Sequence, residues 1–227
     1  MDLSRRVELI ATDSRALAAA AERDLSARIT FCPDWSMADL VRHVLQVHRS
    51  WCRIVEEGIT EPAWSEEPLP GDDDLLPAFL ANAARFAAVL GATDPEKPCW
   101  TWGPEQNAGF VQRFQVQEAA LHRWDAQQAV GPPDPIATDG AADSIVQLEG
   151  IMPLAAPDAT TGFTLVATDA PVDVTLRPNL DAKVVGALRG TASDLLLAYW
   201  RRIPVESLEV TGDAAAVAAA IAAADLD

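Results

Sequence analysis

The chain has 227 residues, of which 49% are hydrophobic and 22% charged, a composition typical of a folded globular protein with one or two domains. Acidic residues outnumber Lys and Arg by 34 to 17, so the net charge of −17 argues against nucleic acid or an anionic membrane as a general partner. There is no signal-peptide-like apolar segment at the N-terminus and no run of about 18 uncharged apolar residues, which predicts a cytoplasmic protein with no membrane span.

Cysteine and histidine are both scarce. The three cysteines, Cys32, Cys52 and Cys99, are widely spaced and form no CxxC pair, which argues against a disulfide framework or a zinc ribbon. We expect all three to have structural roles. Any histidine-based site must be built from a set of three: His43, His48 and His122.

Strong helix formers and capping signals predict four long helices in the first part of the chain. The second helix begins after Ser36, which can cap it together with Asp39 three residues later. The fourth is stopped by Gly131 and the two prolines that follow it. The expected helices span residues 4–28, 37–57, 75–91 and 110–130, with a shorter one over 139–155.

Beyond Pro157 the pattern changes to alternating, β-branched segments, which predict strands over residues 161–168, 172–177, 183–189 and 208–210. Capping signals at Thr191 and Asp213 predict two further helices. We therefore expect a two-domain α+β protein: a helical bundle over residues 1–157 and a small α+β domain with a mainly antiparallel sheet over residues 158–227.

The fourth helix carries ionisable groups on its apolar face. At about 100° per residue, Glu118, His122 and Asp125 share one face with buried-type residues such as Phe114. A Glu and a His one turn apart suit a divalent metal held between bundle helices. The alternative is that Glu118 and His122 only hydrogen-bond each other or an arginine such as Arg42 or Arg113.

The second helix supplies the other two histidines. Helical periodicity places His48 near the centre of its apolar stripe and His43 about 120° away, so the pattern alone favours His48 as a ligand. Being five residues apart, the two are not expected to bind one metal together.

Four segments carry a family resemblance. The segments CPDWSMADL (Cys32 to Leu40), followed by His43, and EAALHRWDA (Glu118 to Ala126) resemble the mycothiol-dependent maleylpyruvate isomerase family. RGTASDLLL (Arg189 to Leu197) and EVTGD (Glu209 to Asp213) are similar to its C-terminal part. The resemblance implies a DinB-like four-helix bundle followed by a domain similar to sterol carrier proteins.

The resemblance also implies a divalent metal, of zinc type, bound by His43, Glu118 and His122, and so selects His43 over His48. Mycothiol or a similar low-molecular-weight thiol is the implied cosubstrate, so the nucleophile is expected from the thiol and not from the chain. A metal-bound thiol is deprotonated, which makes it a thiolate at neutral pH. Members of this family commonly carry two consecutive arginines shortly before the Glu, whereas this chain reads Arg113-Phe114.

Five further residues are candidates for supporting or substrate-binding roles, each with a plain structural alternative. Asp125 can orient a ligand imidazole, and His48 can pack or support the site. Arg42 and Arg123 can hold a substrate carboxylate or lie on the surface. Trp102 can line the mouth of a pocket or pack in the interior.

The predicted function is a metal- and thiol-dependent isomerase or transferase that acts on a small electrophile. One alternative is a non-catalytic small-molecule-binding or resistance protein, and another is a metal-dependent hydrolase. The protein is expected to be a monomer or a homodimer. The apolar run Leu195 to Leu197, with Tyr199 and Trp200, is expected to complete the site or a dimer contact.

Overall fold

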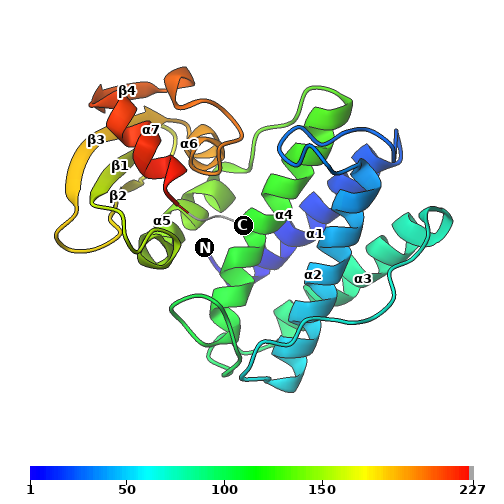
Figure 1. The fold of residues 1–227 in the computed structure, drawn as a ribbon. Helices are drawn as coiled ribbons and strands as arrows, with labels where there is room; N and C mark the ends of the chain where they lie inside the picture. The colour runs from blue at the N-terminus through cyan, green and yellow to red at the C-terminus, as the bar shows by residue number, and fades with distance from the viewer. Residues whose placement is uncertain (225–227) are drawn as a thin grey trace. The chain divides into compact units, whose positions relative to one another are not determined.

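A computed structural model of the chain describes residues 1–224, which divide into two compact units. The first, the helical unit, spans Met1–Asp134, and the second, the C-terminal unit, begins at Pro135. The described residues contain both predicted parts, a helical bundle and a small sheet with helices, so the two-part α+β fold is confirmed (Figure 1).

The helical unit consists of four long helices. α1 packs mainly against α4 and α3, and α2 packs mainly against α3, with smaller contacts to α4 and α1 (Figure 1). Their bounds are α1 Leu3–Ala21, α2 Met37–Glu57, α3 Asp72–Ala92 and α4 Ala108–Val130.

Local signals set most of these boundaries. Ser36 and Asp39 form the predicted capping box at the start of α2, and Gly58, at φ 65°, ends the helix in the left-handed conformation. The expected extension of the first helix to residue 28 is wrong. The chain leaves α1 after Ala21, and Asp24 accepts hydrogen bonds from the backbone N–H and hydroxyl of Ser26, which stabilises a turn instead.

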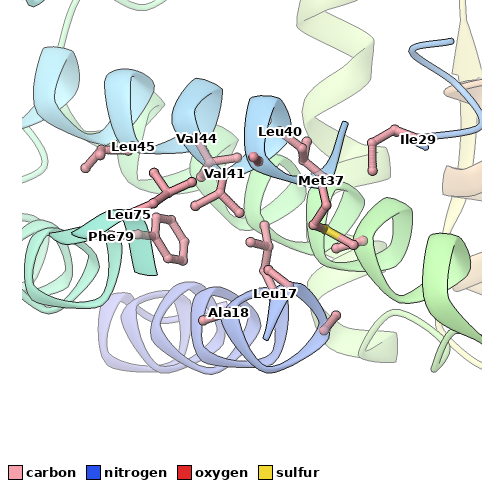
Figure 2. Close-up of a cluster of buried hydrophobic side chains, with 14 residues drawn as sticks. Leu17, Ala18, Ile29, Met37, Leu40, Val41, Val44, Leu45, Leu75 and Phe79 are labelled. Atoms are coloured by element: carbon pink, nitrogen blue, oxygen red, sulfur yellow. The ribbon is translucent and has the colours of Figure 1, made fainter. Parts of the chain in front are cut away.

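Apolar side chains from α1, α2 and α3 meet inside the bundle (Figure 2). Leu17, Val41 and Phe79 are representative members, each at most 1% exposed. By length and composition α3 is the one helix among residues 1–224 that could cross a membrane. Because Phe79 and Phe86 of α3 are buried in the bundle, and core helices pass the same test, this is weak evidence for a span.

The C-terminal unit contains a four-stranded sheet in the order β2-β1-β3-β4. β1 pairs antiparallel with β2 and parallel with β3, and β3 pairs antiparallel with β4, so the sheet is mixed. After β2 the chain crosses to the other side of β1, where β3 runs parallel to β1. The elements are α5 Thr138–Ala155, β1 Thr161–Ala167, β2 Asp173–Leu176, β3 Lys183–Gly190, α6 Ala192–Tyr199, β4 Glu209–Gly212 and α7 Ala214–Ala222.

The helix α5 groups with the C-terminal unit, whereas the sequence pattern places the change of structure after residue 157. α5 contacts β2 and α6, and the Tyr199 hydroxyl of α6 lies 3.9 Å from the sulfur of Met152. The apolar run Leu195 to Leu197 and Tyr199 are already buried within the chain, at most 3% exposed. These side chains therefore form core and leave little surface for a dimer contact.

Candidate metal centre

Three side chains from two neighbouring helices converge on one point of the helical unit. His43 comes from α2, and Glu118 and His122 come from α4. One ligand atom from each residue lies within 4.8 Å of the other two. The Glu118 Oε1 is 3.1 Å from His122 Nε2 and 3.8 Å from His43 Nε2. The rings of His43 and His122 meet edge to face, with centroids 5.1 Å apart.

Helix geometry explains how the sequence produces this cluster. Glu118 and His122 are four residues apart, so they lie one above the other on the same face of α4. α2 packs beside α4 and contributes His43 from its flank. The site remains accessible, because 37% of the His43 side chain is exposed, against 18% for Glu118 and 12% for His122.

The cluster has a strong internal electrostatic coupling. Burial alone would raise the pKa of Glu118, but His122 and His43 beside it hold that pKa far below its usual range. Burial likewise opposes protonation of His122, yet the Glu118 charge and Asp125 raise the pKa of His122 above its ordinary value. Glu118 is therefore a carboxylate that the two neighbouring imidazoles stabilise in its charged form.

Two further groups hold the imidazoles in place. Asp125, one turn beyond His122 and 1% exposed, places Oδ2 3.5 Å from His122 Nδ1, while Nε2 of the same ring faces Glu118 at 3.1 Å. On the α2 side, the Trp35 ring packs against the His43 ring at 5.0 Å between centroids. Asp125 was a candidate from the sequence, whereas Trp35 was noted only as part of the segment Cys32 to Leu40 and not as a neighbour of His43.

The donor set fits a divalent metal of zinc type. Ligand atoms bound tetrahedrally at about 2.0–2.1 Å are about 3.3 Å apart. The Glu118 oxygen lies 3.1 and 3.8 Å from the two imidazole nitrogens, and all three atoms lie within 4.8 Å of one another. Two neutral imidazoles and one carboxylate are the donor set of catalytic zinc sites, which keep one position open for water or substrate.

His48 lies outside this cluster. It is completely buried, and its ring stacks on Phe86 at 4.5 Å and lies 5.9 Å from Phe79. Burial lowers the pKa of His48 to about 3, an effect that the Glu118 charge only partly opposes. Periodicity correctly placed His48 on the core-facing stripe, and for that reason it is directed away from the partly exposed flank that carries His43.

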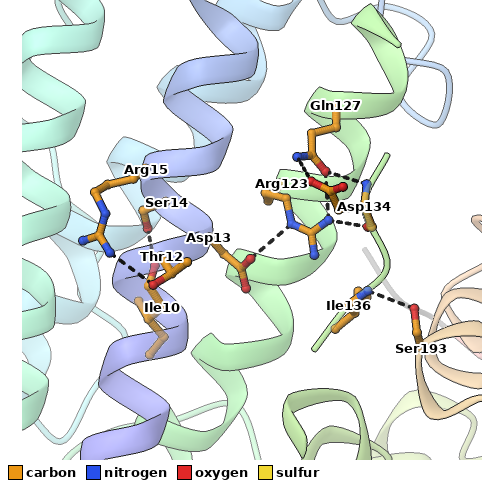
Figure 3. A network of polar contacts seen from close by, with 10 residues as sticks. All are labelled: Ile10, Thr12, Asp13, Ser14, Arg15, Arg123, Gln127, Asp134, Ile136 and Ser193. Carbon is orange, nitrogen blue, oxygen red and sulfur yellow. Dashed lines mark hydrogen bonds and ion pairs between the residues drawn. The ribbon is translucent and has the colours of Figure 1, made fainter. Parts of the chain in front are cut away.

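The two candidate arginines are engaged with other groups. Arg42 donates to the Pro70 carbonyl and pairs with Asp72. Arg123 is buried and donates to Asp13 at 3.1 Å and to Gln127 at 2.9 Å (Figure 3). Both therefore brace neighbouring segments of the helical unit.

Trp102 is 37% exposed and packs edge to face against Phe110 and Phe114, the latter one turn before Glu118. The three cysteines are free thiols. Burial raises the pKa of Cys52 to about 11 and also raises that of Cys99, so neither is a thiolate at neutral pH. Cys32 is only partly buried, and a structural role for the three cysteines stays a prediction.

Comparisons with known proteins agree with the fold. The crystal structure of a mycothiol-dependent maleylpyruvate isomerase superposes with a TM-score of 0.69 at 14% sequence identity, covering 94% of this chain and 95% of that chain. A histidine-to-alanine mutant of such an isomerase gives a TM-score of 0.68, with the same identity and coverage. No curated protein matches the chain.

The family model described as the mycothiol maleylpyruvate isomerase N-terminal domain matches residues 7–127, which is more than half of the chain and includes all three clustered side chains. Through this match the chain belongs to the mycothiol maleylpyruvate isomerase family.

Proposed function

We propose that the protein is a metal- and thiol-dependent enzyme that isomerises a small electrophile or transfers the thiol sulfur to it. The observation that carries this proposal is the convergence of His43, Glu118 and His122. The family match supports mycothiol as the thiol, zinc is the metal that best suits the donor set, and the cytoplasm is the proposed compartment.

In this proposal the ion supplies Lewis acidity and keeps a docked thiol in its thiolate form. The chain's own groups orient the site. Glu118 provides the negative charge between two imidazoles, and the Asp125 carboxylate, 3.5 Å from His122 Nδ1, favours a proton on that nitrogen and leaves Nε2 on the side of Glu118. The exposed flank of His43 leaves this side of the cluster open to small molecules.

The test begins with the metal content of the purified protein, measured by plasma mass spectrometry. We expect about one equivalent of divalent metal in the wild type and less than about a tenth in His122→Ala or Glu118→Gln, because each removes one of three donors. His48→Leu is the matched control, since it removes a histidine of the same helix outside the cluster, and it is expected to retain the metal.

Turnover then distinguishes the reaction classes. Metal-loaded protein is expected to convert an electrophile only when a thiol is added. Equal conversion without thiol would identify a hydrolase that uses activated water, and stable metal binding with no conversion of any electrophile would favour a binding protein. Either result contradicts the proposed function.

A further inference from the structure

His43 and His122 are placed by different kinds of neighbour. The Asp125 carboxylate lies 3.5 Å from His122 Nδ1, and only 12% of the His122 side chain is exposed. The His43 side chain is 37% exposed, and its contacts are the Glu118 oxygen, the His122 ring and the Trp35 ring. Among residues 1–224 no carboxylate pairs with His43 Nδ1 as Asp125 does with His122. On the α2 side the indole of Trp35 therefore takes the place of a charged partner.

The backbone of Trp35 is held by the start of α2. Its N–H donates to the Cys32 carbonyl at 2.8 Å, and its carbonyl accepts from the Ile29 N–H at 3.1 Å. The next residue, Ser36, forms the capping box with Asp39. Hydrogen bonds within the helical unit therefore fix the chain on both sides of the indole.

The Trp35 side chain is anchored as well. It is partly buried and packs against the apolar cluster of the bundle, which includes Met37 and Leu40 of α2 (Figure 2). An indole turns about only two side-chain bonds, so this packing leaves it little freedom. Its ring lies 5.0 Å from that of His43, with an interplanar angle of 48°. The indole thus connects the core of the bundle to the imidazole.

A ligand side chain that is already oriented costs less free energy to order when a metal binds. Charged or hydrogen-bonding partners of ligand imidazoles typically change metal affinity about 10- to 100-fold. A contact between aromatic rings is weaker and corresponds to about three- to tenfold. The contribution of Trp35 is therefore expected to be smaller than that of a carboxylate and still measurable.

Resting on the metal site of the proposed function, we infer that Trp35 is a positioning residue for the metal, which acts by holding the His43 imidazole in its ligating orientation. The affinity for the metal then depends on an aromatic ring beside the cap of α2. An alkyl side chain at position 35 fills part of the same space and offers no ring surface to the imidazole. Comparing the two kinds of side chain separates positioning from core packing.

The test measures the dissociation constant of zinc from the full-length protein at pH 7, by competition with a chromogenic chelator. Trp35→Leu and Trp35→Ile are each expected to raise the dissociation constant about three- to tenfold. Trp35→Phe is expected to bring it back to within about twofold of the wild type, because it restores a ring. Two alkyl variants are used so that a failure of one to fold leaves the other to decide.

Leu17→Ala is the control for loss of core packing. Leu17 belongs to the same apolar cluster and is 1% exposed, but it lies on α1, so its truncation weakens the core from another helix. It is expected to lower the free energy of unfolding and to leave the zinc affinity unchanged.

Nuclear magnetic resonance of the metal-free protein checks the ring contact and the fold together. The chain has three histidines, so three imidazole signals are expected, and His43→Ala assigns one of them. Trp35→Leu removes the ring current of the indole and is expected to shift the His43 signal. The signal of His48, whose ring stacks on Phe86 in the core, is expected to stay in place.

Wild-type zinc affinity in the alkyl variants overturns the inference, as does an equal loss of affinity in Leu17→Ala or an unchanged His43 signal in Trp35→Leu. These measurements use neither thiol nor turnover. A wild type that binds no zinc contradicts the proposed function itself. A wild type that binds zinc only as tightly as Trp35→Leu contradicts this inference alone, so the two failures are distinguishable.

Discussion

His48 is buried in the bundle with both ring nitrogens lacking a hydrogen-bond partner among the described residues. A neutral imidazole still carries one N–H donor and one acceptor, and leaving them unpaired in the interior costs about 1–3 kcal/mol. The stacked rings of Phe86 and Phe79 compensate through apolar contact alone. His48 therefore lowers the free energy of unfolding relative to an apolar residue of similar size at this position.

We predict that His48→Leu is at least as stable as the wild type at pH 7 and that its advantage grows in acid. The folded-state pKa of His48 is lowered to about 3, so between about pH 6.5 and pH 3 only the unfolded chain takes up the proton. Wild-type stability therefore falls as the pH falls, by about 1 kcal/mol per pH unit from this group alone. Urea unfolding at pH 7, 6 and 5 measures the difference, and a constant difference would contradict the prediction.

The pair of Asp13 and Arg123 joins α1 to α4 in the interior, with side chains 13% and 4% exposed. Burial raises the pKa of Asp13, while the Arg123 charge partly opposes that rise. Removing the carboxylate leaves a buried guanidinium without its main partner, so we predict that Asp13→Ala lowers the free energy of unfolding by about 3 kcal/mol.

The exposed pair of Arg5 and Glu8 provides the control for Asp13→Ala. Its side chains are 38% and 63% exposed, and Glu8→Ala is expected to cost at most about 0.5 kcal/mol. The double variant Asp13→Ala with Arg123→Leu is expected to recover part of the loss, because no charge remains unpaired. Equal costs for Asp13→Ala and Glu8→Ala in chemical unfolding would show that the buried pair contributes little.

Among the elements, the start of α2 was predictable because Ser36 and Asp39 cap it as expected. The start of α4 was placed two residues late, because the cap at Asn107, which accepts from the Phe110 backbone N–H, was not identified. The end of α1 was not predictable in this way, because the turn around Asp24 is formed by residues with no strong helix-breaking signal.

The candidate site shows the same division between local and tertiary information. Helical spacing alone brings Glu118 and His122 together on one face. The choice of His43 depends on which flank of α2 packs against α4, which periodicity within α2 does not contain. The resemblance supplied it, and the structure places His43 3.8 Å from Glu118.

Two glycines test how tightly the elements are packed. Gly103→Ala puts a Cβ into the Phe110 ring, so we predict a loss of about 1–3 kcal/mol and disturbed packing of Trp102. Gly91→Ala, in α3, meets only Val7 at 3.7 Å and is expected to gain about 0.5 kcal/mol, because alanine favours the helix. Thermal unfolding measures both, and a destabilising Gly91→Ala or a neutral Gly103→Ala would disprove the packing argument.

At the scale of the whole molecule, α5 determines where the chain can be divided. Its helical composition makes it resemble the preceding bundle, so sequence alone groups it with residues 1–157. In the structure it contacts β2 and α6, and its buried side chains include Ile145, Leu148 and Met152. Packing between segments that are distant in the sequence cannot be predicted from the hydrophobic periodicity within one segment. The same holds for the parallel pairing of β1 with β3.

This packing predicts different behaviour for two truncated chains. Residues 1–134 contain all four bundle helices and all three candidate ligands, so this fragment is expected to unfold cooperatively and to bind about one equivalent of metal. Residues 1–157 retain α5 without the sheet and helix against which it packs, which exposes a large apolar face and favours aggregation. Size-exclusion chromatography and metal analysis compare the two fragments. A longer fragment that is monodisperse, alongside a shorter one that aggregates, would place the boundary near residue 157 and assign α5 to the helical unit.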